Sequence, residues 1–256
     1  MKKGNLKILN RDMVKYLAIG LMFVGHLISW LALLNHPDDP LAPYRLPLWK
    51  IVLEEAAVFC PPVMFFFIAD GYKYTRDRKK YALRLLIFAC ITQLFDWFVF
   101  LERNGWRSFN VIFTLLLGLL SIMAWESKLK RWQRIALVIL CDAATVLIFS
   151  EWMIFGVLFI LVLHIFRDRP KTRFIVYLSL TLIYNGIYTA ALIGNVSALI
   201  SAVVFLGGML VMTAAYLCMT GFYNGNKGKH PVFAKWFFYA FYPVHYIIIY
   251  AVRICT

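Results

Sequence analysis

The chain has 256 residues, of which 62% are hydrophobic and 16% charged, and it carries 27 Lys and Arg against 13 Asp and Glu. A soluble domain has about 25% charged residues and about half apolar ones, so this composition excludes an ordinary soluble protein and predicts an integral membrane protein. A net charge of +14 would suggest a nucleic-acid partner in a soluble chain. Here the positive residues fall in short loops between apolar segments, so no nucleic-acid partner is expected.

Each apolar segment predicts a helix, and together they predict an all-α polytopic membrane bundle of about nine spans that forms one domain over residues 1–256. The first segment has no small-residue cleavage site after it and is expected to be retained. Three segments in the middle of the chain are shorter than the roughly 20 residues that a full crossing needs, so 135–166 either crosses or re-enters. In chain order the segments are 13–34, 51–73, 82–101, 110–125, 135–149, 152–166, 174–193, 196–219 and 236–254.

The positive residues predict the orientation of the chain. Of the 27 Lys and Arg, 22 fall in alternate loops and termini, beginning with the amino terminus. Cytoplasmic loops carry the excess of Lys and Arg, so we expect a cytoplasmic amino terminus in a multi-pass protein of the cell (inner, plasma) membrane. One of these basic loops, 220–235, is rich in Gly and Asn and is expected to be flexible.

The first segment carries one ionisable residue in its middle, His26. It lies eleven residues after Lys15, about 16 Å along a helix, and the hydrocarbon layer is about 30 Å thick. A polar group near the midplane is costly and is a functional candidate by default. The same count from other cytoplasmic boundaries places four more polar side chains at similar depth: His245, Asp96, Asn185 and Asp142.

Histidine can take or give a proton near neutral pH and would act in acyl transfer as general base on a hydroxyl or an amine. We expect His26 to be this base and His245 to be a second catalytic or acceptor-positioning residue. Asp96 either orients a histidine or the acceptor, or is a structural hydrogen-bond partner. The five cysteines are scattered and form no cluster with histidine, so no metal site is predicted.

Basic side chains at the predicted cytoplasmic ends have two interpretations. They are the orientation signal alone, or they also form a cationic mouth for a phosphorylated donor such as coenzyme A. Asn110 and Thr114, at the outer end of the fourth segment, are candidates to line the acceptor side. The donor-binding candidates are Arg11, Lys15, Arg76, Lys80 and Arg84.

Five stretches together resemble one family, the TraX-type membrane proteins, named for F-pilin acetylation. They begin RDMVKYLAIG at 11, FFFIADGYKY at 65, NVIFTLLLGL at 110, FGVLFILVLH at 155 and FYPVHYIIIY at 241. A more distant similarity is to the membrane acyltransferases that O-acetylate bacterial surface polysaccharides, which have Arg, ten residues and His in their first span. Lys15 and His26 take those two places here, and Asp70 stands where that family has a serine.

The resemblance implies an acetyl-CoA-dependent acetyltransferase. Acetyl-CoA would bind from the cytoplasm, and the acceptor would be an envelope glycan, lipid or protein amino terminus at the outer face. A different class, a proton-coupled transporter, would also place His and Asp in a buried relay, although the internal repeats common in transporters are not evident. A third alternative is a membrane partner that assembles or anchors another protein, in which the histidines would be dispensable.

Overall fold

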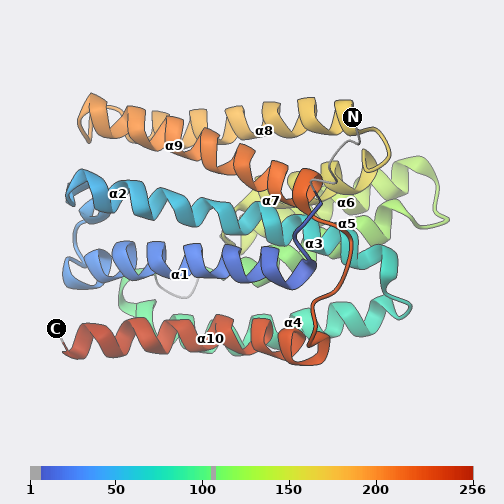
Figure 1. The fold of residues 1–256 in the computed structure, drawn as a ribbon, viewed down its shortest axis with the longest axis horizontal. Coiled ribbons are helices and arrows are strands. Elements are labelled where there is room, and N and C mark those ends of the chain that lie inside the picture. The colour runs from blue at the N-terminus through green and yellow to red at the C-terminus, as the bar shows by residue number, and fades with distance from the viewer. Residues whose placement is uncertain (1–6, 105–107, 256) are drawn as a thin grey trace. The chain divides into compact units, whose positions relative to one another are not determined.

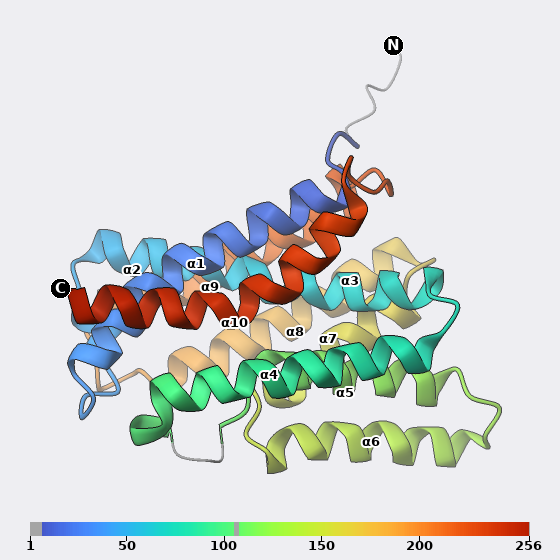
Figure 2. The same ribbon diagram turned by 90° about the horizontal axis from the view of Figure 1, so that it is seen from below.

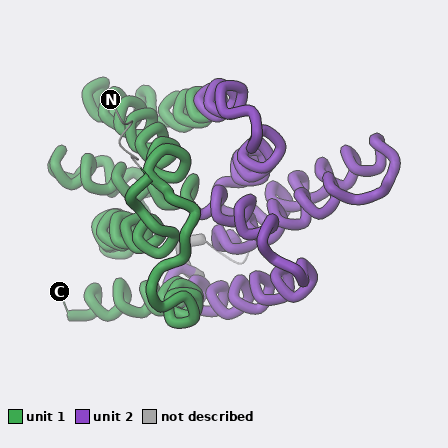
Figure 3. The backbone as a smooth tube through the Cα atoms, turned by 45° about the vertical axis from the view of Figure 1, so that its right-hand side comes forward, with its two compact units in different colours: residues 1–63, 181–256 green, residues 64–180 purple. Residues whose placement is uncertain are grey.

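The computed structural model describes residues 7–104 and 108–255 as helices joined by short connections, with no β-strand in those ranges. The prediction of an all-α membrane bundle is confirmed. The chain packs as two compact units, Met1–Val63 with Thr181–Thr256, and Met64–Leu180 (Figure 3). We call them unit 1 and unit 2. That the whole chain is one transmembrane domain stays a prediction.

Unit 1 contains a layer of neighbouring helices. Figure 1 shows α9 (Ala198–Leu217), α2 (Leu48–Glu55), α1 (Arg11–Asn35) and α10 (Pro231–Cys255) side by side in that order, and the packing contacts agree. α1 begins where the Asn10 side chain accepts hydrogen bonds from the backbone N–H groups of Asp12 and Met13, the usual role of Asn at a helix N-cap. α10 begins at a proline, which is tolerated in the first turn. Both helices start at the same end of the layer (Figure 1).

The predicted span 51–73 is a continuous helical run, Leu48–Tyr74. It consists of α2, a 3-10 turn η2 (Ala56–Phe59) and α3 (Cys60–Tyr74). Pro61 and Pro62 do not break it because they lie in the first turn of α3. Backbone packing against α1 is tight at Gly25, where an added Cβ would lie 2.5 Å from Ala57 Cβ and 3.0 Å from Glu54 O. This close approach fixes which face α1 turns toward its other neighbour, α10.

Unit 2 is built around α5 (Val111–Trp125), which packs against α4 (Arg78–Asn104), α6 (Arg131–Leu147) and α7 (Met153–Ile165). Figure 2 shows α4, α5 and α6 running along one another. Glycines allow the close contacts: an added Cβ at Gly118 would lie 2.2 Å from Ile160 Cδ1, and at Gly156 2.2 Å from Thr114 Cγ2. The remaining long helix, α8 (Pro170–Ala190), begins in unit 2 and ends in unit 1.

Each of the nine predicted segments coincides with a helix in the described residues, and five helical runs there are long and apolar enough to cross a membrane. α5 and α7 are shorter apolar helices. The cytoplasmic placement of the amino terminus, and whether 135–166 crosses or re-enters, stay predictions. Lys2, Lys3 and Arg107, which enter the charge count, lie outside the described residues. The five runs are Arg11–Asn35, Leu48–Tyr74, Arg78–Phe100, Ala198–Phe222 and Pro231–Cys255.

Candidate functional site

The structure brings the two predicted histidines together in unit 1. α1 carries His26 and α10 carries His245, and Nδ1 of His26 lies 3.4 Å from Nε2 of His245, slightly longer than an ordinary hydrogen bond. The ring centroids are 5.5 Å apart. His245 is fully buried, with 0% of its surface exposed, whereas His26 is only partly buried. His26 is therefore the more exposed ring of the pair.

Hydrogen bonding assigns the protons of this pair. Nδ1 of His245 contacts the backbone carbonyl of Tyr242, and because a carbonyl only accepts, that nitrogen carries the proton. Nε2 of a neutral His245 is then an acceptor, so Nδ1 of His26 donates to it. Nε2 of His26 is left with a lone pair. The arrangement thus presents one basic nitrogen, held in orientation by a second imidazole.

Aromatic rings enclose the pair. Trp30, one turn after His26 on α1, stacks on it with ring centroids 4.1 Å apart and planes at 19°. On α10, Phe241 lies parallel to His245 at 5.8 Å, and Tyr246 contacts both Trp30 and His245. These rings lock the imidazoles in place, and the face of Trp30 attracts a cation above it. The ring of Trp30 would therefore stabilise the protonated form of His26.

The bend of α10 belongs to this site. Figure 2 shows α10 changing direction part-way along its length, and Pro243 lies inside the helix, two residues before His245. An interior proline removes one backbone hydrogen bond and kinks the helix. The kink lies beside the segment that supplies both His245 and the Tyr242 carbonyl.

Asp96 and Asn110 share a buried hydrogen-bond network in unit 2, and Gln93 joins them. The Gln93 side chain donates to Asp96 Oδ2 and to the Ser108 carbonyl, both at 2.9 Å. Its oxygen accepts from the backbone N–H and the side-chain amide of Asn110, each at 2.9 Å. Sequence reasoning missed Gln93, although it lies three residues before Asp96 on the same helix face. The proposed role of Asp96 beside a histidine stays a prediction.

Asn110 caps α5, since its side-chain oxygen accepts from the N–H of Ile112 at 3.0 Å, and its amide also donates to the Ala89 carbonyl at 3.0 Å. Its substitution Asn110→Ala is expected to lower the free energy of unfolding by about 1–3 kcal/mol, because it removes a buried cap and leaves polar partners unsatisfied. The measurement is the thermal midpoint of the purified protein in detergent. Asn195→Ala is the control, because Asn195 is exposed and its side-chain amide donates to the Ala191 carbonyl at 3.3 Å. Equal shifts in the two variants would contradict a structural role for Asn110.

Thr114 lies one turn further along α5 and contacts the turn between α6 and α7. Its hydroxyl donates to Ser150 Oγ at 2.9 Å and also contacts the Glu151 carbonyl. Phe149 and Trp152 of this turn and Met153, the first residue of α7, have positive φ, a conformation that costs energy and is sustained by its surroundings. Asn110 and Thr114 thus hold helix ends together, and their place on the acceptor side stays a prediction.

Comparison with known proteins identifies the family. A family model described as "TraX protein" matches residues 10–253. The chain belongs to the TraX family. The probable fimbrial assembly protein FimC, serogroup H1, of Dichelobacter nodosus is 32% identical over an alignment of 195 residues that covers 72% of this chain and 75% of that relative. No solved structure matches. The range matched by the family model, residues 10–253, includes both histidines and every other candidate site residue.

Two of the donor-binding candidates of this TraX family member lie on α1 in unit 1. The Arg11 guanidinium donates to the Asp12 carboxylate at 2.9 Å, so Asp12 already neutralises part of its positive charge. Lys15 Nζ lies over the ring of Phe238, 5.1 Å from the centroid. Both side chains are at the end of α1 where the predicted cytoplasmic surface begins. Their role toward a donor stays a prediction.

The other three candidates are in unit 2. The backbone N–H of Lys80 donates to the Asp77 carboxylate, and Lys80 Nζ also pairs with that carboxylate at 3.4 Å. The backbone hydrogen bond first, and then the ion pair, lower the pKa of Asp77 below its usual value. Arg84 lies 5.8 Å from the Tyr81 ring centroid, and Arg76 is exposed. Asp77 thereby caps α4, so Lys80 has a structural partner in this TraX family member whatever its role toward a donor.

The remaining polar residue of the predicted layer with a clear structural role is Asn185. Its amide donates to the Thr181 carbonyl at 2.8 Å and contacts Met212 Sδ at 3.4 Å. An added Cβ at Gly208 would lie 1.9 Å from its side-chain oxygen. Asn185 therefore marks a tight crossing of α8 and α9.

Proposed function

We propose that this TraX family member is a membrane-embedded acetyltransferase that moves an acetyl group from cytoplasmic acetyl-CoA to a hydroxyl or amine acceptor at the outer face of the cell membrane. The observation that carries the proposal is the orientation of the histidine pair. Its hydrogen bonds leave Nε2 of His26 with a lone pair on the ring that is partly exposed. A base positioned in this way is what acyl transfer to a hydroxyl or an amine requires.

The chemistry balances with this one base. Nε2 of His26 takes the proton from the acceptor O–H or N–H as the acceptor atom bonds to the thioester carbonyl carbon. Collapse of the tetrahedral intermediate breaks the carbon–sulfur bond, and the protonated His26 returns the proton to the departing thiolate. The products are the acetylated acceptor and free coenzyme A, and His26 ends neutral. No covalent acyl-enzyme is needed.

His245 and Trp30 support the base in different ways. His245 accepts a hydrogen bond from Nδ1 of His26. This keeps the proton of His26 on Nδ1, holds the ring in orientation and leaves Nε2 of His26 unprotonated. The stacked face of Trp30 stabilises the imidazolium that forms during transfer. In a low-dielectric environment this stabilisation counts for more than it would in water. His245 is thus a positioning residue and His26 the catalytic one.

The relative's name narrows the class of acceptor. The similar Dichelobacter nodosus protein is named as a probable fimbrial assembly protein, and the TraX family is named for pilin acetylation. We therefore propose that the acceptor is an envelope component, with a fimbrial or pilin subunit as the first to examine. A glycan or lipid hydroxyl fits the same base, because His26 serves either acceptor atom.

The experiment uses the purified full chain in liposomes with radiolabelled acetyl-CoA and an envelope fraction from cells that lack the gene. The proposal predicts label in an envelope acceptor, with one free thiol released for each acetyl group transferred. A proton-coupled transporter, the other use of a buried histidine pair, would give proton or substrate flux without label transfer. That outcome would overturn the acetyltransferase proposal.

A further inference from the structure

A surface cavity of about 230 Å³ lies beside the first turns of α1 and α10 in unit 1. Its lining combines two aromatic rings with two basic groups and one carboxylate: Tyr16, Phe233, Lys229, His230 and Asp12. The orientation argument places this end of both helices on the cytoplasmic side. Neither the proposed base nor the donor candidates from the sequence account for the cavity.

The walls of the cavity are fixed by hydrogen bonds. The segments 9–11 and 222–226 are joined by three backbone hydrogen bonds of 2.8–3.0 Å. Asp12 Oδ2 accepts from the N–H of Gly228 at 3.2 Å, and an added Cβ at Gly228 would lie 2.3 Å from that oxygen. The loop expected from its composition to be flexible is therefore tied to the start of α1. The cavity is a built feature of the fold.

The size of the cavity limits what it can hold. Sites for whole drug-sized ligands measure about 300–1,000 Å³, so a cavity of about 230 Å³ takes one flat ring system with its sugar and leaves the rest of a larger molecule outside. Tyr16 is 38% exposed and Phe233 64% exposed. Both rings also contact Phe237, and the exposed part of each ring can contact a base. Lys229 and His230 supply donors suited to phosphate. Together these groups match a nucleotide.

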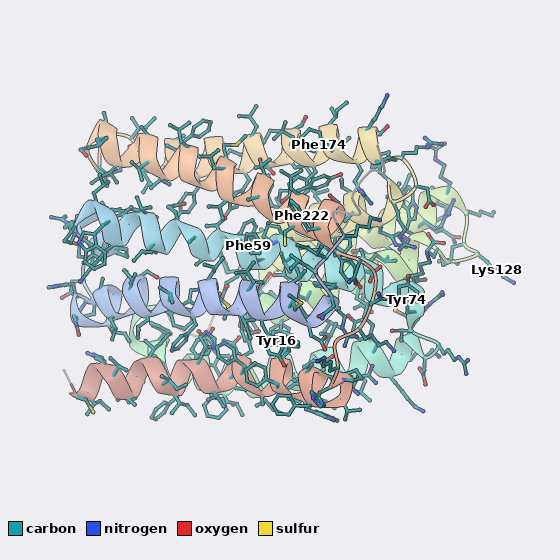
Figure 4. The ribbon with its side chains drawn as sticks, viewed as in Figure 1. Tyr16, Phe59, Tyr74, Lys128, Phe174 and Phe222 are labelled. Atoms are coloured by element: carbon teal, nitrogen blue, oxygen red, sulfur yellow. The ribbon has the colours of Figure 1, made fainter. Side chains whose placement is uncertain are left out.

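A seam of aromatic contacts between α1 and α10 leads from the cavity to the histidine pair. Tyr16 lies between the two helices (Figure 4), 5.0 Å from the ring centroid of Phe238. Further along, Phe23 contacts Phe241 at 5.9 Å, and Phe241 stacks on His245. From Tyr16 to His26 is ten residues, about 15 Å along the helix. The line of aromatic contacts along the α1–α10 interface therefore joins the cavity to the histidine pair.

We infer that the cavity binds the adenosine bisphosphate end of acetyl-CoA, with the pantetheine arm extended along the α1–α10 seam so that the thioester reaches His26. The adenine stacks on Tyr16 and Phe233, and the phosphates lie at Lys229 and His230. The inference rests on the proposed function and assigns its donor site to unit 1. It moves the main phosphate contacts away from Arg76, Lys80 and Arg84.

The test measures binding to the purified full chain in phosphatidylcholine nanodiscs. The probes are acetyl-CoA and adenosine 3′,5′-bisphosphate, the nucleotide half without the thioester. We expect the two to compete, and Phe233→Ala and Lys229→Gln each to raise both dissociation constants about tenfold. Val232→Ala is the matched control, because Val232 directly precedes Phe233, is 70% exposed and lies outside the cavity lining. It should bind as the wild type does.

The outcomes separate this inference from the proposed function. If the wild-type protein does not bind acetyl-CoA, the proposed function is wrong and the proposed donor site is wrong as well. Wild-type protein that binds acetyl-CoA, with Phe233→Ala and Lys229→Gln binding equally well, refutes the donor site alone. If phosphatidylglycerol added to the nanodisc is held at these residues and the bisphosphate does not bind, the cavity is a lipid headgroup site and the inference is wrong.

Discussion

Replacing His26 by alanine or glutamine is expected to lower the rate of acetyl transfer by about 10²–10⁴-fold, the usual contribution of a positioned general base. The effect should fall on kcat, because the proposed mechanism places His26 at the reacting atoms and not at the nucleotide end of the donor. Glutamine keeps much of the size and polarity of the side chain but has no basic nitrogen. Acetyl transfer from labelled acetyl-CoA, together with binding of acetyl-CoA, measures both effects.

His36 provides the matched control for this variant. It lies in the exposed residues just after α1, and its backbone N–H closes the last turn by donating to Ala32. His36→Ala should transfer acetyl groups at the wild-type rate. If His26→Gln remains folded and transfers acetyl groups as fast as His36→Ala, then His26 is not the base and the mechanism is wrong.

His245→Leu is expected to lower kcat about 10²-fold, the cost of a misplaced catalytic group, with little change in the KM for acetyl-CoA. Leucine fills most of the buried volume but accepts no hydrogen bond from Nδ1 of His26. His245→Gln should recover a substantial part of the rate, because an amide oxygen can accept that hydrogen bond. Steady-state kinetics at several acetyl-CoA concentrations separate kcat from KM.

The glutamine variant distinguishes positioning from a merely structural role. If His245 only fills space, leucine should be tolerated at least as well as glutamine in this apolar surrounding. Equal activity of the two variants, or better activity of His245→Leu, would show that the hydrogen bond between the imidazoles is unimportant for transfer.

The membrane helices and the histidine pair could be predicted because both follow from one-dimensional rules. α1 was expected over 13–34 and is Arg11–Asn35. Counting 1.5 Å per residue from a charged boundary placed His26 and His245 at one depth, and apolar lipid favours turning both inward. Their contact at 3.4 Å agrees with that reasoning.

What the sequence did not reveal depends on helix rotation and on contacts between distant segments. The Tyr242 carbonyl that orients His245 is a backbone atom and leaves no residue-type signal. The cavity exists because the segment before α1 pairs with the loop before α10, which no periodicity encodes. That loop looked flexible from its Gly and Asn content, but Gly228 is there for close packing on Asp12.

The capping role of Asn110 shows a second limit. Depth and residue type made Asn110 a candidate for the acceptor side, whereas its hydrogen bonds to Ile112, Ala89 and Gln93 give it a local structural purpose. Buried polar residues in membrane helices serve both purposes. Only the partner atoms distinguish them.

In the proposed mechanism the two imidazoles act as one unit, with His245 working only through His26. Acetyl-transfer rates of His26→Gln, His245→Leu and the double variant test it most directly, because residues that act together have strongly non-additive effects. The double variant is predicted to be no slower than His26→Gln alone. If the rate loss of the double variant equals the product of the two single losses, the two histidines have independent roles and the proposed mechanism is wrong.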